Sequence, residues 1–365
     1  MFSNESKRNA EACRFCWMCR HICTVSNVTG NEADTPRAKG LMVSMVSRGE
    51  PYNAEMAEIM YHCSLCDACA NDCATNYKPS QYIREARTLA VQEEMEPASV
   101  HKAIENLTEK GNLFGLTEID PAVAEAVASL PKQAEVLVYV GQTAAYHQKK
   151  SVLSLFSLLR KADVSFTALE KEPISGAYLG DLMGYTGDVQ AVAEQVDAAV
   201  RGTGAKQLVA LNPHDAQIFL QQYQEWGLLE GIRVSTATSF VASLISEGKL
   251  TVTKRGGEVS LHDPCRLTRG LDESEPVRTI LAAMGVELKE LFLNRRMSRC
   301  CGGLVLEAYD PGMAKLTARN REEDAMRLGY QQVVTACPDC LELLQKYGEG
   351  TVTYTDIFCM LDESC

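Results

Sequence analysis

The pattern of hydrophobic and polar positions changes along this chain and divides it into a helical beginning and an α/β remainder. In the first part, helical patterns cover residues 36–48 and 54–62 and predict short helices. Leu41, Met42, Met45 and Val46 repeat at the i, i+1, i+4, i+5 spacing of one helix face. We expect these four side chains to be buried.

Beyond residue 132, short apolar runs typical of strands alternate with helical patterns. Strands are expected at 135–140 and 164–169, and helices at 151–160 and 189–200, the second with Asp188 as its N-cap and Gly202 as its stop. A second round begins with a strand at 259–262 and closes with a helix at 337–347. This alternation predicts parallel βαβ units.

The sequences of these two series of strands and helices can be aligned with each other. Gln142 then falls on Cys265, residues 174–176 fall on 300–302, and residues 212–215 fall on 337–340, with intervening segments of nearly equal length. Both copies keep a proline in the last segment. We interpret this as an internal duplication in which only the second copy carries the cysteines.

Composition narrows the classes of function. A chain of 365 residues suits two or three domains, and a net charge of -12 argues against a nucleic-acid partner. The sequence has no secretory leader and no apolar run of the length of a membrane span. We therefore expect a cytoplasmic protein without a span of its own, whose membrane association, if it has any, comes through a partner.

Fifteen cysteines in such a chain indicate metal binding or catalysis, because disulfides are rare in a reducing compartment. Two runs share the spacing CxxCxxCxxxC, namely Cys13, Cys16, Cys19 and Cys23, and Cys63, Cys66, Cys69 and Cys73. In two-cluster ferredoxins the last cysteine of each run ligates the other cluster. That rule groups the first three cysteines of each run with the last cysteine of the other, and pairing within each run is the alternative. Zinc is the alternative metal, although zinc sites generally use paired CxxC elements.

A third pattern lies in the second α/β copy and consists of Cys265, Cys300, Cys301, Cys337 and Cys340. The side chains of adjacent cysteines diverge along the backbone and do not easily occupy two corners of one cubane. Such a pair suits a larger or split cluster. Arg299 directly precedes the pair, and its positive charge could raise the reduction potential of an anionic cluster, with a solvated basic patch as the alternative.

The two runs and the helical segment between them resemble the α-helical ferredoxin module of succinate dehydrogenase and fumarate reductase iron-sulfur subunits. The third pattern resembles the cysteine-rich CCG domain of heterodisulfide reductase catalytic subunits and of iron-sulfur subunits of anaerobic glycerol-3-phosphate, glycolate and lactate dehydrogenases. The resemblance implies a mixed fold, in which an α-helical ferredoxin domain precedes a duplicated α/β domain. The expected parts are a ferredoxin-like domain at 1–95, a helical connector at 96–131, a degenerate CCG-like half at 132–250, and a CCG half with an intact motif at 251–365.

The same resemblance implies the cofactors. It predicts two cubane [4Fe-4S] clusters and one noncubane [4Fe-4S] cluster at the CCG motif, where a cubane or zinc remain alternatives. Gly302 and Gly303 would then allow the backbone to approach that cluster with positive φ.

The chain has no GxGxxG fingerprint after a strand, no P-loop and no hydrolase motif, so no catalytic residue is predicted. We expect the iron-sulfur subunit of an anaerobic oxidoreductase complex rather than an independent enzyme. It would relay electrons between a FAD-type flavoprotein dehydrogenase subunit and a quinone or other redox acceptor, with further redox subunits. The alternative is a catalytic disulfide reductase-type subunit that uses the CCG cluster.

Overall fold

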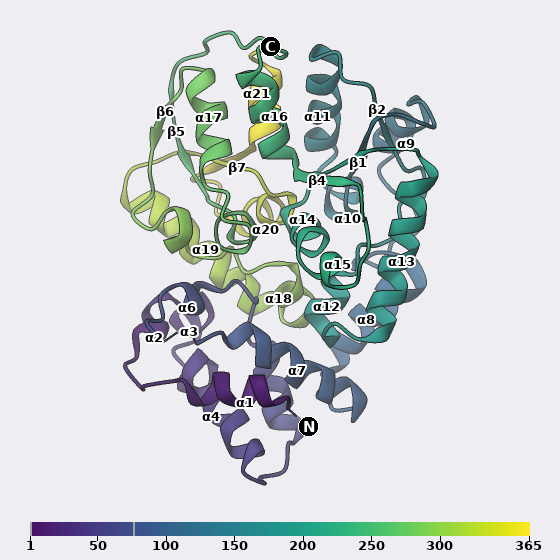
Figure 1. Cartoon of the computed structure of the whole chain (residues 1–365). Helices are drawn as coiled ribbons and strands as arrows, with labels where there is room; N and C mark the ends of the chain where they lie inside the picture. The colour runs from purple at the N-terminus through teal and green to yellow at the C-terminus, as the bar shows by residue number, and fades with distance from the viewer. Residues whose placement is uncertain (1, 76) are drawn as a thin grey trace.

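The computed structural model describes residues 2–75 and 77–365, and its first part is a set of short helices (Figure 1). They are α1 (Asn4–Glu11), α2 (Met18–Ile22), α3 (Thr24–Thr29), the 3₁₀ turn η1 (Glu32–Asp34), α4 (Pro36–Ser47), α5 (Ala54–Tyr61), α6 (Ala68–Asn71) and α7 (Pro79–Gln92). Helix α7 packs against α1, α4 and α5. Two further helices, α8 (Ala98–Lys110) and α9 (Pro121–Ala128), lead to the first sheet.

Helix α4 forms where the sequence predicts it, because Thr35 caps its first turn and Pro36 suits that position. Its expected buried face is wrong in part, since Leu41 and Met45 are 46% and 40% exposed. The helix turns Gly40 inward instead, and the hydroxyl ends of Tyr77 and Tyr82 pack directly on that glycine. A close approach at a small residue therefore decides which face of α4 is buried.

The first α/β half alternates strand and helix as predicted. Its elements are β1 (Val136–Tyr139), α10 (Gln142–Tyr146), α11 (Lys149–Lys161), β2 (Phe166–Ala168), α12 (Ala177–Met183), α13 (Gly187–Gly202), β3 (Gln207–Ala210), α14 (Pro213–Leu220), α15 (Gln222–Glu225), β4 (Arg233–Thr236) and α16 (Ala237–Ser246). The four strands are parallel in the order β2-β1-β3-β4.

The expected ends of α13 are wrong by a short distance. The N-cap position belongs to Thr186, and Asp188 lies inside the first turn, where its charge suits the helix dipole. Gly202 is the last residue of the helix rather than its stop.

The second half repeats this arrangement. It comprises β5 (Glu258–Leu261), the π-helical turn η2 (Arg266–Gly270), α17 (Glu275–Ala283), β6 (Glu287–Lys289), the turn η3 (Arg295–Met297), α18 (Leu304–Tyr309), α19 (Pro311–Arg327), β7 (Gln332–Thr335), α20 (Pro338–Tyr347), β8 (Thr353–Asp356) and α21 (Ile357–Asp362). Its parallel sheet has the order β6-β5-β7-β8, which is the order of the first sheet. The predicted duplicated α/β fold is therefore confirmed.

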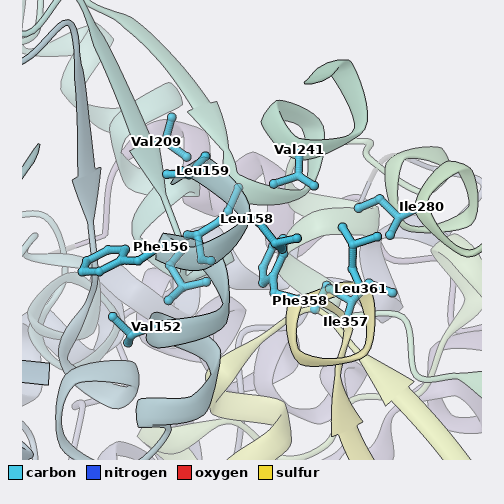
Figure 2. Close-up of a cluster of buried hydrophobic side chains, with 14 of the residues drawn as sticks. Val152, Phe156, Leu158, Leu159, Val209, Val241, Ile280, Ile357, Phe358 and Leu361 are labelled. Carbon is cyan, nitrogen blue, oxygen red and sulfur yellow. The ribbon is translucent and has the colours of Figure 1, made fainter. Parts of the chain in front are cut away.

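The two halves join through four helices that lie side by side between the strands of the two sheets (Figure 1). Helix α11 packs on α21, and α16 packs on α17. In each contact, a helix that follows the first strand of one half meets the helix that follows the last strand of the other half. Figure 2 shows Leu158 of α11 next to Phe358 of α21, with Leu361 of α21 beyond it. Burial of these side chains stabilises the join by about 1.5–3 kcal/mol each. No described helix has the length and apolar character needed to cross a membrane.

Candidate iron-sulfur centres

The first cavity that cysteines line lies in the N-terminal helical part. Its walls include Cys13, Cys16, Cys19 and Cys73. The chain turns around the cavity with positive φ at Phe15 (55°) and Trp17 (67°), a conformation that non-glycine residues rarely adopt. The Phe15 amide donates a hydrogen bond of 3.4 Å to Cys13 Sγ.

A second cavity repeats this geometry with the other run. It is lined by Cys23, Cys63, Cys66 and Cys69. Leu65 and Asp67 take the same positive φ, at 50° and 57°, and the Leu65 amide donates to Cys63 Sγ at 3.4 Å. In both cavities the fourth cysteine comes from the other run, as the crossed arrangement expects, and metal ligation by these residues stays a prediction.

Buried positive charges surround the second cavity. Lys39, Arg87 and Arg269 are buried and donate to backbone carbonyl oxygens, and no described carboxylate pairs with any of them. A buried charge is costly without an opposite charge nearby. A [4Fe-4S] core with four thiolates carries net negative charge, so the surroundings of this cavity fit such a cluster.

The third group of cysteines gathers at the carboxyl ends of β5 and β7, where parallel α/β sheets bind ligands. Cys265 directly precedes η2, Cys300 and Cys301 precede α18, and Cys337 and Cys340 lie at the start of α20. The Sγ atoms of Cys301 and Cys340 are 3.2 Å apart. All five residues line one cavity.

A buried histidine, His262, lies beside two cysteines of this group. One ring nitrogen of His262 lies within 4.8 Å of the Sγ atoms of Cys301 and Cys340. Its Nδ1 accepts a hydrogen bond from Arg321, and within the described chain its Nε2 is buried without a partner. Burial lowers the pKa of His262, and because Nδ1 accepts from Arg321, the neutral ring carries its proton on Nε2 and can donate it to a cysteine sulfur.

The glycines after the cysteine pair have the expected backbone conformation, and the preceding arginine points elsewhere. Gly302 and Gly303 have φ of 112° and 75°, and a Cβ on Gly302 would lie 2.5 Å from Thr317 Oγ1. The Arg299 guanidinium instead binds Asn320 and Asp324 of α19. Contact between a cofactor and any of these three predicted residues stays a prediction.

The second and third cavities share a wall. Ser64 lines both, and the thiols of Cys66 and Cys300 interact, which lowers the pKa of Cys66 to about 5. Arg269 follows this boundary, because its guanidinium donates to the carbonyl oxygens of Cys66 (2.6 Å) and Ser298 (2.6 Å). The ferredoxin-like part and the second α/β half therefore meet at their cysteines.

The sequence reasoning named all thirteen cysteines of the three cavities and Arg266 beside Cys265, but missed Asp181 and His214. Arg266 forms a buried ion pair with Asp181, which also binds Arg84 and His214. The third cavity is lined by Asp181, His214 and Arg266 together with the cysteines. Asp181 and His214 lie in the first half, so nothing near the cysteines in the sequence signals them.

Comparisons with known proteins agree with this geometry. Residues 9–77 match the 4Fe-4S dicluster domain, and residues 259–345 match the cysteine-rich domain. The chain is 28% identical over 309 residues to a probable membrane-anchored ferredoxin of Chromohalobacter salexigens (79% of this chain, 45% of that protein). It is 28% identical over 314 residues to the probable iron-sulfur-binding oxidoreductase FadF of Bacillus subtilis (80% and 44%).

A third relative is matched over most of its length. The chain is 25% identical over 360 residues to one of the subunits of the dihydromethanophenazine:CoB--CoM heterodisulfide reductase of Methanosarcina acetivorans (90% of this chain, 87% of that protein). By contrast, the chain spans less than half the length of the first two relatives.

Fold, cavities and matched domains together define an iron-sulfur protein. More particularly, the chain combines a 4Fe-4S dicluster domain with a duplicated α/β domain whose second half is a cysteine-rich CCG domain.

Proposed function

We propose that this chain is the electron-transfer subunit of an oxidoreductase complex, with two cubane [4Fe-4S] clusters and one noncubane [4Fe-4S] cluster. In this proposal, Cys13, Cys16, Cys19 and Cys73 hold the first cubane, and Cys23, Cys63, Cys66 and Cys69 hold the second. The five cysteines at the ends of β5 and β7 hold the third cluster. These clusters would carry electrons between a flavoprotein dehydrogenase subunit and a quinone or other redox acceptor.

The observation that carries the proposal is the continuity of the three cysteine sites. The two ferredoxin-like cavities exchange one cysteine each, Cys23 and Cys73. The second of these cavities meets the third at Cys66 and Cys300. Separate structural metal sites need no such contact, whereas electron transfer requires each centre to lie close to the next.

The surface around the first cavity supports a partner at that end. Phe15, Trp17 and Met18 are 54%, 39% and 44% exposed around the exposed Cys16. The guanidinium of Arg37 lies 4.0 Å from the Trp17 ring centroid. Exposed aromatic residues with neighbouring arginines are typical of interfaces, so we place the flavoprotein subunit here. We call Phe15, Trp17 and Met18 the aromatic face.

The chain's own first half weighs against the disulfide-reductase alternative, although one relative is named as part of a heterodisulfide reductase. Gln142, Ser175 and Asp215 stand where the second half has Cys265, Cys301 and Cys340. A mechanism that cleaves a disulfide between two such clusters needs a cluster in each half, and the first half has no cysteines to hold one. That alternative predicts that the isolated chain reduces a disulfide with an artificial electron donor, and the relay predicts no turnover.

Rapid mixing of the anaerobic chain with its reduced flavoprotein subunit tests the relay. The wild-type chain should show reduction of all three centres. In Cys300→Ser, reduction should stop at the two cubanes, whereas Cys365→Ser at the exposed tail should behave as wild type. Equal reduction of the third centre with and without the cubanes would overturn the proposed order of electron transfer.

A further inference from the structure

The first α/β half has a large cavity in the place where the second half has its cysteine site. The cavity has a volume of about 730 Å³ and lies at the carboxyl ends of β1 and β2. Gln142, Ile174, Ser175 and Asp215 line it, and the repeat aligns these residues with Cys265, Cys300, Cys301 and Cys340. The half without cysteines therefore keeps a hollow site at the position of the cluster.

Two carboxyl groups lie in the polar wall of this cavity. Glu172 accepts hydrogen bonds from the amides of Val140 and Gly141, both at 2.7 Å. Asp215 accepts one from the Ser175 hydroxyl through Oδ1, while its buried Oδ2 has no partner among residues 2–75 and 77–365. Gly141 has a φ of 77°, and a Cβ there would lie 2.5 Å from this free oxygen.

The rest of the wall is mainly apolar. Its apolar side chains include Ile119, Val123, Val127, Tyr139, Tyr146 and Ile174, and its other charged residues are Lys110, Glu118, Glu170 and Lys171. A cavity of this kind, apolar with a few convergent polar groups, is the usual form of a small-molecule site.

A short series of contacts links this cavity to the cysteine site. Asn212 lies beside Gly141, and its Nδ2 donates to Asp339 at 2.7 Å. On the same side chain, Oδ1 lies 4.0 Å from Cys337 Sγ. Asp339 itself stands between the two cysteines of α20. The contacts therefore run from Asp215 in the cavity wall through Gly141 and Asn212 to Cys337, a proposed cluster ligand.

We propose that this cavity binds a quinone-type acceptor, whose carbonyl oxygens take hydrogen bonds from the carboxyl groups of Glu172 and Asp215. The inference rests on the proposed function, because the electrons come from the iron-sulfur chain. The quinone takes up two electrons from that chain and one proton from each carboxyl group, and leaves as the quinol. The two carboxylates then recover their protons from solvent through the mouth of the cavity.

The protonation of the two acids supports this chemistry. Burial raises the pKa of Glu172 to about 8 and that of Asp215 to about 7, so at neutral pH Glu172 is mostly protonated and Asp215 about half protonated. The titratable groups that face them inside the fold are Tyr139, Tyr178, Tyr223 and Asp339. Two carboxylic-acid donors stabilise a bound quinone through hydrogen bonds to its carbonyl oxygens. The sulfur atoms of a disulfide accept hydrogen bonds only weakly, so the same donors would stabilise a bound disulfide little.

The test uses the chain with its clusters intact and menadione, a small naphthoquinone, as the probe. Ala124 on α9 lines the cavity, and Glu125 is exposed on the same helix but lies outside it. Ala124→Trp should weaken menadione binding about tenfold or more in calorimetry, a loss of about 1.4 kcal/mol, while Glu125→Trp leaves it unchanged. Infrared difference spectra should show a shifted carboxylic-acid C=O band on binding, and Asp215→Asn should remove part of that band.

Reoxidation of the reduced clusters separates this inference from the proposed function. Menadione should reoxidise them more slowly in Ala124→Trp and Glu172→Gln, whereas ferricyanide, which needs no site, should act equally on all variants. Normal cluster reduction and ferricyanide oxidation, together with menadione binding that Ala124→Trp does not change, would overturn the cavity assignment alone. Reoxidation by a small disulfide that Ala124→Trp blocks would overturn the quinone assignment. Absence of the clusters would instead overturn the proposed function.

Discussion

The guanidinium of Arg269 donates a 2.6 Å hydrogen bond to the backbone carbonyl oxygen of Cys66. Arg269 belongs to η2 of the second α/β half, and Cys66 belongs to the ferredoxin-like part. One buried cation therefore lies against the proposed ligands of two neighbouring centres. A positive charge in this position stabilises the reduced form of both centres, because reduction adds negative charge.

Replacing this arginine tests its electrostatic role. We expect Arg269→Gln to lower the reduction potential of the second and third centres by about 60 mV, which for one electron corresponds to about 1.4 kcal/mol. The first centre should change less, since it lies farther from the substitution. Redox titration followed by electron paramagnetic resonance (EPR) measures all three potentials. Arg327→Gln, an exposed arginine on α19, removes the same charge and should leave them unchanged; equal shifts in both variants would contradict the assignment.

The grouping of the cysteines makes a second prediction, on which residues share a cluster. If the ligands cross between the runs, Cys73→Ser should remove the same EPR signal as Cys16→Ser, and Cys23→Ser the same signal as Cys66→Ser. Each variant should lose about four iron atoms at most. Pairing of Cys23→Ser with Cys16→Ser would show instead that each run binds its own cluster.

The aromatic face predicts where the partner binds. We expect Trp17→Ala to slow cluster reduction by the flavoprotein subunit about tenfold, because removing an exposed aromatic anchor costs more than about 1 kcal/mol at an interface. Reduction by dithionite and the iron content should stay the same. Leu316→Ala serves as the control, since Leu316 is also an exposed apolar residue but lies on α19. An unchanged rate in Trp17→Ala would place the partner elsewhere.

The buried carboxyl groups of the first half predict a pH dependence of stability. The folded chain keeps protons on Glu172 and Asp215 up to pKa values of about 8 and 7, whereas the unfolded chain releases them near pH 4. The unfolded state therefore binds fewer protons between about pH 4 and pH 8, and the free energy of unfolding should fall across this range.

Asp215→Asn should remove the Asp215 part of this pH dependence. Its asparagine Oδ1 can still accept from Ser175, so at pH 8 we expect the variant to be more stable than wild type by about 1–3 kcal/mol. The gain should disappear near pH 4. Urea denaturation at several pH values measures it, with Glu125→Gln as an exposed control. A gain that is the same at every pH would contradict the role of ionisation.

The sequence predicted the fold where local pattern and repeat agree. Strands β1 and β5 and the cysteine loops could be placed because apolar runs and cysteine spacing are local signals. The side chains that surround the sites could not be placed in this way. Lys39, Arg87 and Arg269 reach the second cavity from three different elements, and only the folded chain brings them together.

The buried face of helix α4 also could not be predicted from the sequence. Its apolar residues lie on more than one face, so periodicity alone could not tell that Gly40 is turned inward rather than Leu41. The packing of Tyr77 and Tyr82 decides this, and both residues lie about forty positions further along the chain.

The most direct test of the account is the iron content and EPR spectrum of the anaerobically purified chain. Three [4Fe-4S] centres predict about 12 iron atoms per chain and three distinguishable signals, of which Cys300→Ser removes one. Material that carries no iron, or zinc at all three sites, and yet transfers electrons normally in its complex would contradict the central claim.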